Sequence, residues 1–155
     1  MENYMKLEIA ALSENEGFAR SAVSAFALCL NPSLSEMSDI KTAVSEAVTN
    51  SIVHAYPRGN KDNYITIECK VNALSGELHI EITDTGCGIE NLEQALTPFY
   101  TTLPCQERSG MGFTIMQTFM DAFAIDSKTG AGTKITMKKR IGFDEKQGTK
   151  NRLNA

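Results

Sequence analysis

The order of helical and strand patterns along the 155-residue chain is the feature that most constrains its fold. Strands and helices do not alternate one by one, as they would in a doubly wound parallel sheet. The expected elements are, in order, a strand (4–10), two helices (one capped at Ser13 with apolar spacing over 18–30, the other 35–56), two strands (64–71, 77–84), a helix (113–123) and two strands (124–127, 133–140). This order predicts an α+β fold, a two-layer sandwich of a mostly antiparallel sheet with helices on one face.

Composition limits the classes of partner that such a domain can have. The hydrophobic fraction is 42% and the charged fraction 22%, both ordinary for a globular protein, and no run of eighteen apolar residues occurs. The N-terminus lacks the features of a signal peptide, so we expect a cytoplasmic protein without membrane contact. A net charge of -4 argues against a sequence-independent nucleic-acid binder, which needs a basic face. The four scattered cysteines predict reduced thiols.

The long helix carries the first candidate pair, Glu46 and Asn50. Residues four apart project from the same side of a helix. A carboxylate and an amide oxygen in that relation suit a general base beside a Mg²⁺ ligand, because Mg²⁺ prefers hard oxygen donors. Glu and Asn are also common on solvated helix faces, and the pair alone does not distinguish these alternatives.

A second candidate begins where a strand ends at Asp84 and continues as Thr85-Gly86-Cys87-Gly88. Two glycines allow backbone to approach a ligand closely. A buried carboxylate at this place is able to accept a hydrogen bond from an exocyclic amine such as that of adenine. A tight turn after a hairpin explains the same residues equally well.

The third candidate is Gly110-Met111-Gly112, directly before a predicted helix. Free N–H groups and the helix dipole hold phosphate oxygens at such a helix start. Arg108 and Ser109 add a cation and a hydroxyl just before it. A lone pair of glycines also serves as a plain loop hinge.

Taken together and in this order, the three motifs resemble those of the GHKL ATPase superfamily, which includes the ATP domains of histidine kinases and the anti-sigma serine kinases. Glu46 to Asn50 matches the N box, Asp84 to Gly88 the first glycine box, and Gly110 to Phe113 the second. Thr133 matches a late threonine that helps to bind adenine through water. The resemblance implies the GHKL, or Bergerat, form of the two-layer sandwich.

Three longer segments, 46–56, 98–102 and 107–116, are similar to the anti-sigma kinases of spore-forming bacteria. This closer resemblance implies ATP and Mg²⁺ as cofactors. Glu46 is then the catalytic base, Asn50 contacts Mg²⁺, and Asp84 binds the adenine amine. The other nucleotide-binding residues implied are Gly86, Gly88, Arg108, Ser109, Gly110, Met111, Gly112 and Thr133.

The same resemblance implies partners and boundaries. We expect residues 1–140 to form the kinase domain, and the polar composition of 141–155 predicts a disordered tail. The partners implied are a sporulation sigma factor, an anti-anti-sigma factor phosphorylated on serine, and a second copy that pairs through the N-terminal strand. Arg20 matches a partner-facing arginine, although an exposed helix arginine is usually solvated, and Arg108 suits phosphate and partner alike. The alternative function is a nucleotide-gated sigma-binding module without significant kinase activity.

Overall fold

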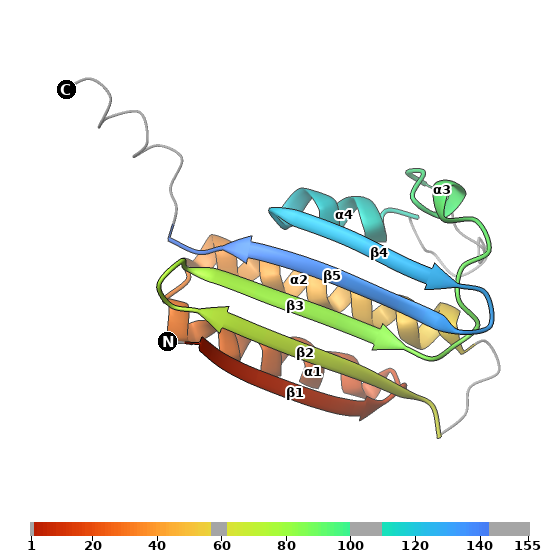
Figure 1. Cartoon of the computed structure of the whole chain (residues 1–155), viewed down its shortest axis with the longest axis horizontal. Coiled ribbons are helices and arrows are strands. Elements are labelled where there is room, and N and C mark those ends of the chain that lie inside the picture. The colour runs from red at the N-terminus through yellow and green to blue at the C-terminus, as the bar shows by residue number, and fades with distance from the viewer. Residues whose placement is uncertain (1, 57–61, 100–109, 143–155) are drawn as a thin grey trace.

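A β-sheet and the helices that cover one of its faces make up the described part of the protein, as Figure 1 shows. The structure is a computed structural model that describes residues 2–56, 62–99 and 110–142. In these ranges no helix is both long and apolar enough to cross a membrane. The elements are β1 (Glu2–Ala10), α1 (Glu14–Ala27), a 3₁₀ turn η1 (Leu28–Leu30), α2 (Leu34–Asn50), a π-helical segment η2 (Ser51–Ala55), β2 (Tyr64–Asn72), β3 (Glu77–Asp84), α3 (Leu92–Ala95), α4 (Gly112–Phe119), β4 (Ala122–Lys128) and β5 (Gly132–Arg140).

The strands form one sheet in the order β1-β2-β3-β5-β4, and each neighbouring pair is antiparallel. Helices α1 and α2 lie side by side behind this sheet in Figure 1, and the opposite face is open. The predicted two-layer α+β sandwich with helices on one face is therefore confirmed. β1 lies at an edge of the sheet.

The core lies between the inner face of the sheet and the helices α1 and α2. Alternating burial along β2 and β3 follows the period of two that a half-buried strand requires. Full burial of one Ile or Val side chain contributes about 1.5–3 kcal/mol to folding. The inner residues of β2 and β3 include Ile65, Ile67, the free thiol Cys69, Leu78, Ile80 and Ile82, and α2 contributes Ile40, Ala43, Val44, Ala47 and Val48.

Helix α2 begins with a capping box at Ser33. The Ser33 Oγ accepts a hydrogen bond from the Glu36 N–H at 3.2 Å, and the Glu36 Oε2 accepts one from the Ser33 N–H at 2.7 Å. Two of the N–H groups that lack helical partners are satisfied in this way. The predicted start at residue 35 differs from the observed one by a single residue.

The predicted α-helix over 35–56 was wrong at its end, because its last turn widens into the π-helical segment η2. The Ser51 hydroxyl donates to Asp84 Oδ2 at 2.9 Å, and the Ala55 carbonyl accepts from the Cys87 N–H at 2.9 Å. These contacts, to the last residue of β3 and to the loop after it, stabilise the wider turn. Single π turns inside helices occur frequently at functional sites.

The predicted helix over 113–123 was also too long. Helix α4 ends at Phe119, and β4 already begins at Ala122. The Asp121 N–H donates to the Lys138 carbonyl at 2.9 Å, and the Asp121 Oδ2 accepts from the Arg140 N–H at 2.6 Å. Pairing with β5 therefore overrides the helical spacing of the apolar residues in this stretch.

The residues directly after β5 pack against the domain, although the predicted domain boundary lies at residue 140. Ile141 is buried, and its N–H donates to the Gly76 carbonyl at 2.9 Å. The Gly142 N–H donates to Glu36 Oε1 at 2.9 Å. Residues 143–155 of the predicted tail lie outside the described residues.

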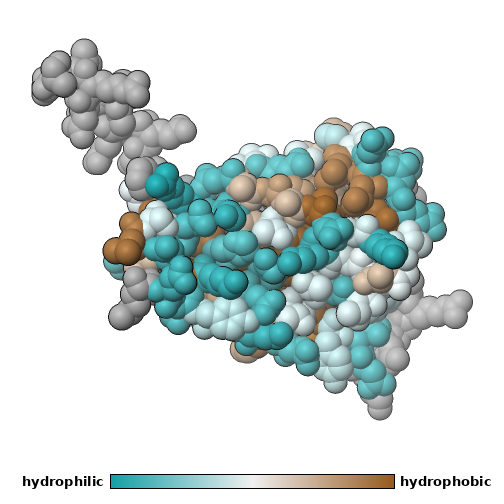
Figure 2. All heavy atoms as spheres, in the orientation of Figure 1, coloured by the Kyte–Doolittle hydropathy of each residue, from teal (hydrophilic) through white to brown (hydrophobic). Residues whose placement is uncertain are grey.

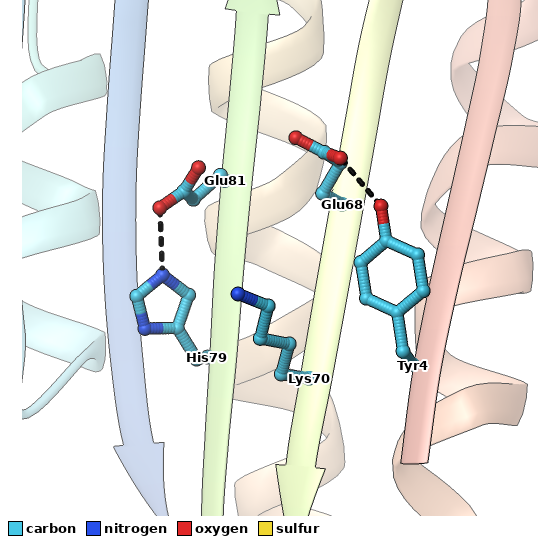
Figure 3. A pocket seen from close by; sticks show the side chains of 5 residues that line it. All are labelled: Tyr4, Glu68, Lys70, His79 and Glu81. Carbon is cyan, nitrogen blue, oxygen red and sulfur yellow. Dashed lines mark hydrogen bonds and ion pairs between the residues drawn. The ribbon is translucent and has the colours of Figure 1, made fainter.

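Hydrophilic side chains cover most of the open face of the sheet in Figure 2. A hollow of about 300 Å³ lies on this face. Figure 3 shows the side chains that line it: Tyr4, Glu68, Lys70, His79 and Glu81. The Tyr4 hydroxyl donates to Glu68, and His79 Nε2 lies 3.1 Å from Glu81 Oε1. The first contact links β1 to β2, and the second joins two residues of β3, so polar side chains of the open face contribute to the stability of the sheet.

Candidate functional site

A cavity of about 590 Å³ opens where the C-terminal half of α2 meets the ends of β3 and β5 and the start of α4. The structure brings most of the predicted site residues to its wall. Those lining the cavity are Glu46, Asn50, Asp84, Gly88, Gly110, Met111, Gly112 and Thr133. Gly86 packs behind this wall, and Arg20 lies on α1 away from the cavity. Arg108 and Ser109 lie outside the described residues.

The acid and amide of the long helix face the first turn of α4. Glu46 and Asn50 are both half-buried on successive turns of α2. A methyl group on Gly112 would lie 3.1 Å from Glu46 Oε2 and 3.3 Å from Asn50 Nδ2. The lack of a side chain at Gly112 therefore lets α4 start next to both functional groups.

Asp84 is a buried carboxylate held by neutral donors. Its Oδ2 accepts from the Ser51 hydroxyl at 2.9 Å, and its Oδ1 accepts from the N–H groups of Gly86 and Thr133 at 3.1 and 3.2 Å. Burial raises the pKa of Asp84 above its usual value, against the opposing effect of these three donors. A carboxylate has about four acceptor positions, so capacity for a further donor remains.

The glycines of the loop after β3 allow the backbone to pack tightly. A methyl group on Gly86 would lie 2.3 Å from the Ala55 carbonyl oxygen, and Gly88 has a φ of +70°. Between them, the Cys87 carbonyl accepts from the Gly130 N–H at 2.7 Å. The motif predicted that its glycines let the backbone approach a ligand closely. Gly86 instead approaches the backbone of Ala55, whereas Gly88 lines the cavity.

Two serines complete the site although the sequence did not single them out. Ser51 follows Asn50 directly and orients Asp84. The Ser127 Oγ lies 2.8 Å from the Thr133 Oγ1 and accepts from the Ile89 N–H at 2.9 Å. Ser127 faces Thr133 in the β4–β5 register, so only the strand pairing reveals it.

The start of α4 supplies donors for an anion. Gly110 adopts a φ of +67°, which favours glycine, and its carbonyl accepts from the Phe99 N–H at 3.1 Å. Gly110, Met111, Gly112 and Phe113 all line the cavity. The first N–H groups of a helix lack intrahelical acceptors and lie at the positive end of its dipole. This end of the cavity suits phosphate oxygens.

Comparison with known proteins gives the class of the fold. Residues 9–139 match the family described as the histidine kinase-like ATPase domain. The fold is similar to the RsbU and RsbW domains of Rv1364c from Mycobacterium tuberculosis, with a TM-score of 0.62 and 16% identity over 90% of this chain and 32% of that one. It is also similar to the nucleotide-free catalytic domain of the histidine kinase ThkA, with a TM-score of 0.52 and 14% identity over 88% of this chain and 97% of that one.

Sequence relatives narrow the class. The chain is 52% identical over 140 residues to the anti-sigma F factor of Clostridium beijerinckii, covering 90% of this chain and 96% of that protein. It is 49% identical over 138 residues to the anti-sigma F factor of Clostridium kluyveri, covering 89% of this chain and 94% of that protein. The chain therefore belongs to the anti-sigma F factor family of histidine kinase-like ATPase domains.

Proposed function

We propose that the chain is a cytoplasmic anti-sigma factor that binds a sporulation sigma factor and uses ATP to phosphorylate a serine of its anti-anti-sigma antagonist. The observation that carries this proposal is the convergence of Glu46, Asn50, Asp84 and the start of α4 on one cavity. Its relatives are named as anti-sigma F factors, which supports the choice of partner.

The cavity suits ATP in size and in chemistry. Its volume of about 590 Å³ lies within the range of small-molecule sites. The remaining acceptor capacity of Asp84 matches the exocyclic amine of adenine, and the N–H groups at the start of α4 match phosphate oxygens. We assign Thr133 to water-mediated adenine contact and Ser109 to phosphate. Arg108 is assigned to phosphate or partner.

The donors near the phosphate end suit Mg²⁺. Asn50 offers an amide oxygen next to Glu46. Among the residues that the structure describes, no three His, Cys, Asp or Glu side chains gather to hold a metal. A site with few protein ligands fits Mg²⁺, which keeps several waters and takes phosphate oxygens. Bound there through Asn50, it would neutralise charge on the phosphates.

Glu46 is the proposed general base. The serine hydroxyl oxygen of the antagonist attacks the γ-phosphorus, its proton passes to the Glu46 carboxylate, and the bond to the β-phosphate oxygen breaks to release ADP. Phosphoryl transfer depends chiefly on positioning and charge neutralisation. A general base adds about 10²–10⁴-fold in rate.

The kinase proposal is tested by incubation with labelled ATP, Mg²⁺ and a candidate anti-anti-sigma protein. Glu46→Ala should lower phosphate transfer by about 100-fold or more and leave ATP affinity within about threefold. Glu93→Ala on the exposed side of α3 is the matched control and should transfer at the wild-type rate. Wild-type protein that binds ATP yet labels no such partner would refute the kinase assignment.

The second candidate is a module in which ATP only sets the affinity for a sigma factor. This candidate is favoured because Asp84 and the start of α4 would suffice to bind ATP without the carboxylate of Glu46. In this case Glu46→Ala leaves sigma binding and its nucleotide dependence unchanged, and in cells the variant still regulates the sigma factor normally.

Two further surfaces are assigned to partners. The nine-residue strand β1 has a neighbour on one side only among the described residues, and such an open strand edge favours pairing with a second copy. Arg20 is about half exposed and lies 3.7 Å from Glu16, on the surface of α1. Light scattering at micromolar concentration should give the mass of a dimer, and a monomeric mass would exclude this pairing.

A further inference from the structure

Lys139 is a charged residue in the buried row of β5. The inner positions of this strand and its extension alternate as Ile135, Met137, Lys139 and Ile141, and all four are buried. Lys139 is only 7% exposed. Lysine is almost never buried unless it is paired, because the desolvation of an ammonium group is costly. Its presence among apolar neighbours therefore calls for a specific reason.

The Lys139 ammonium group joins three elements. Its Nζ donates to Asp39 Oδ2 at 3.0 Å and to the Phe119 carbonyl oxygen at 2.7 Å. Asp39 lies in the N-terminal part of α2, and Phe119 is the last residue of α4. The last carbonyl groups of a helix lack intrahelical donors and lie at the negative end of its dipole, so a cation there stabilises the helix.

Helix α4 is short and runs from the cavity to this ammonium group. Eight residues at 1.5 Å each give a length of about 12 Å. A helix of this length is not stable alone and depends on tertiary contacts. Gly112 begins it beside Glu46 and Asn50, Met116 is fully buried at its middle, and Lys139 holds its last carbonyl.

We propose that Lys139 is a positioning residue that fixes where the start of α4 stands in the cavity, and thereby how well the site binds phosphates. This inference rests on the proposed ATP site. A short helix moves as a unit, so release of its end at Phe119 shifts Gly112 relative to Glu46. The adenine end is independent of α4, because Asp84 is held by η2, by the loop after β3 and by β5.

The test compares two ligands that differ only in phosphates. Lys139→Met keeps the length of the side chain and removes the ammonium group. In calorimetric titrations with Mg²⁺, at a temperature where each variant is folded, ATP affinity should fall about tenfold, whereas adenosine affinity should stay within about twofold. Lys138→Met is the matched control, since this neighbouring side chain is half exposed and paired with Glu77 on the open face. It should leave both affinities unchanged.

Asp39→Asn is a second variant that keeps the ammonium group and its bond to Phe119. It should weaken ATP about threefold and spare adenosine, so the inference stays testable if Lys139→Met does not fold. An unchanged ratio of ATP to adenosine affinity, whether both fall equally or neither falls, overturns the positioning role. Wild-type protein that binds no ATP refutes the proposed site itself, which is a separate outcome.

Discussion

Two carboxylates of β3 lie three residues apart on opposite faces of the sheet and have opposite surroundings. On the open face, Glu81 accepts from Lys134 at 2.9 Å and lies 3.1 Å from His79. The hydrogen bond from Lys134 lowers the pKa of Glu81, helped by His79. On the inner face, burial raises the pKa of Asp84, whose donors are a hydroxyl and two backbone N–H groups.

The difference separates Glu81, a carboxylate that stabilises the fold, from Asp84, the carboxylate that we propose binds a ligand. Folding favours the ionised form of Glu81. This carboxylate therefore stabilises the folded protein at a pH above the pKa that it has in the unfolded chain, and the stabilisation is lost as the pH falls through its lower pKa in the folded protein. Folding disfavours the ionised form of Asp84. This carboxylate therefore destabilises the folded protein, increasingly so as the pH rises from the pKa of the unfolded chain to the higher pKa of the folded protein. A buried group that opposes folding at neutral pH is typical of a functional site.

The largest effect should come from Asp84→Asn. The amide replaces one acceptor oxygen with a donor group, which faces either the Ser51 hydroxyl or the N–H groups of Gly86 and Thr133. We expect ATP affinity to fall at least about 100-fold, since hydrogen bonds to a charged group contribute about 1.5–3 kcal/mol each. Calorimetry measures this, with Glu81→Gln as the control on the open face. Equal losses in both variants would remove the contrast between the two faces.

Gly112→Ala should have the next largest effect. Its methyl group would lie 3.1 Å from Glu46 Oε2 and 3.3 Å from Asn50 Nδ2, so one of these side chains or α4 must shift. We expect ATP affinity to fall about tenfold, since overpacking costs about 1–3 kcal/mol. Gly17→Ala in α1 is the control, because its methyl group meets only Arg20 at 3.9 Å. That variant should gain about 0.5–1 kcal/mol in unfolding free energy and bind ATP normally.

Tyr56→Phe should have a smaller effect on the same site. The Tyr56 hydroxyl donates to the Tyr64 carbonyl at 2.8 Å and accepts from the Thr85 N–H at 3.0 Å, so it holds the loop after Asp84. Loss of a hydrogen bond costs about 1 kcal/mol, and we expect ATP to bind about fivefold more weakly. Unchanged ATP affinity together with a lower melting temperature would show that Tyr56 serves stability alone.

Glu81→Gln should have the smallest effect and none on ATP. Because its partners are partly exposed, we expect the unfolding free energy at pH 7 to fall by less than about 1 kcal/mol. The difference from wild type should shrink as the pH falls below 4.5, through the lowered pKa of Glu81. Urea unfolding between pH 7 and pH 3 measures it. A difference that grows on acidification would contradict the assigned role of Glu81.

Local patterns sufficed to predict the sheet and the long helix, whereas the cavity wall was predicted only when the motifs were read together with the family resemblance. Glu46 and Asn50 are a helical turn apart, and Asp84 ends an alternating strand, so short-range spacing carries their placement. The end of α4 and the π-helical segment were missed, because pairing with β5 and contacts to the Cys87 loop override local propensity. Ser127 was missed because only the pairing of β4 with β5 places it opposite Thr133, and Lys139 because Asp39 and Phe119 are distant in sequence.

The most direct test of the account is a calorimetric comparison of ATP with GTP, both with Mg²⁺. In the proposed site Asp84 accepts a hydrogen bond from the amine of adenine, whereas guanine would present a carbonyl oxygen at that position, which the carboxylate would repel. A site built on a hydrogen bond rejects an analogue that lacks the donor, so ATP should bind one to one and GTP at least about 100-fold more weakly. Asp84→Asn should narrow this preference. Equal affinity for the two nucleotides, or no binding of ATP at millimolar concentration, would contradict the account.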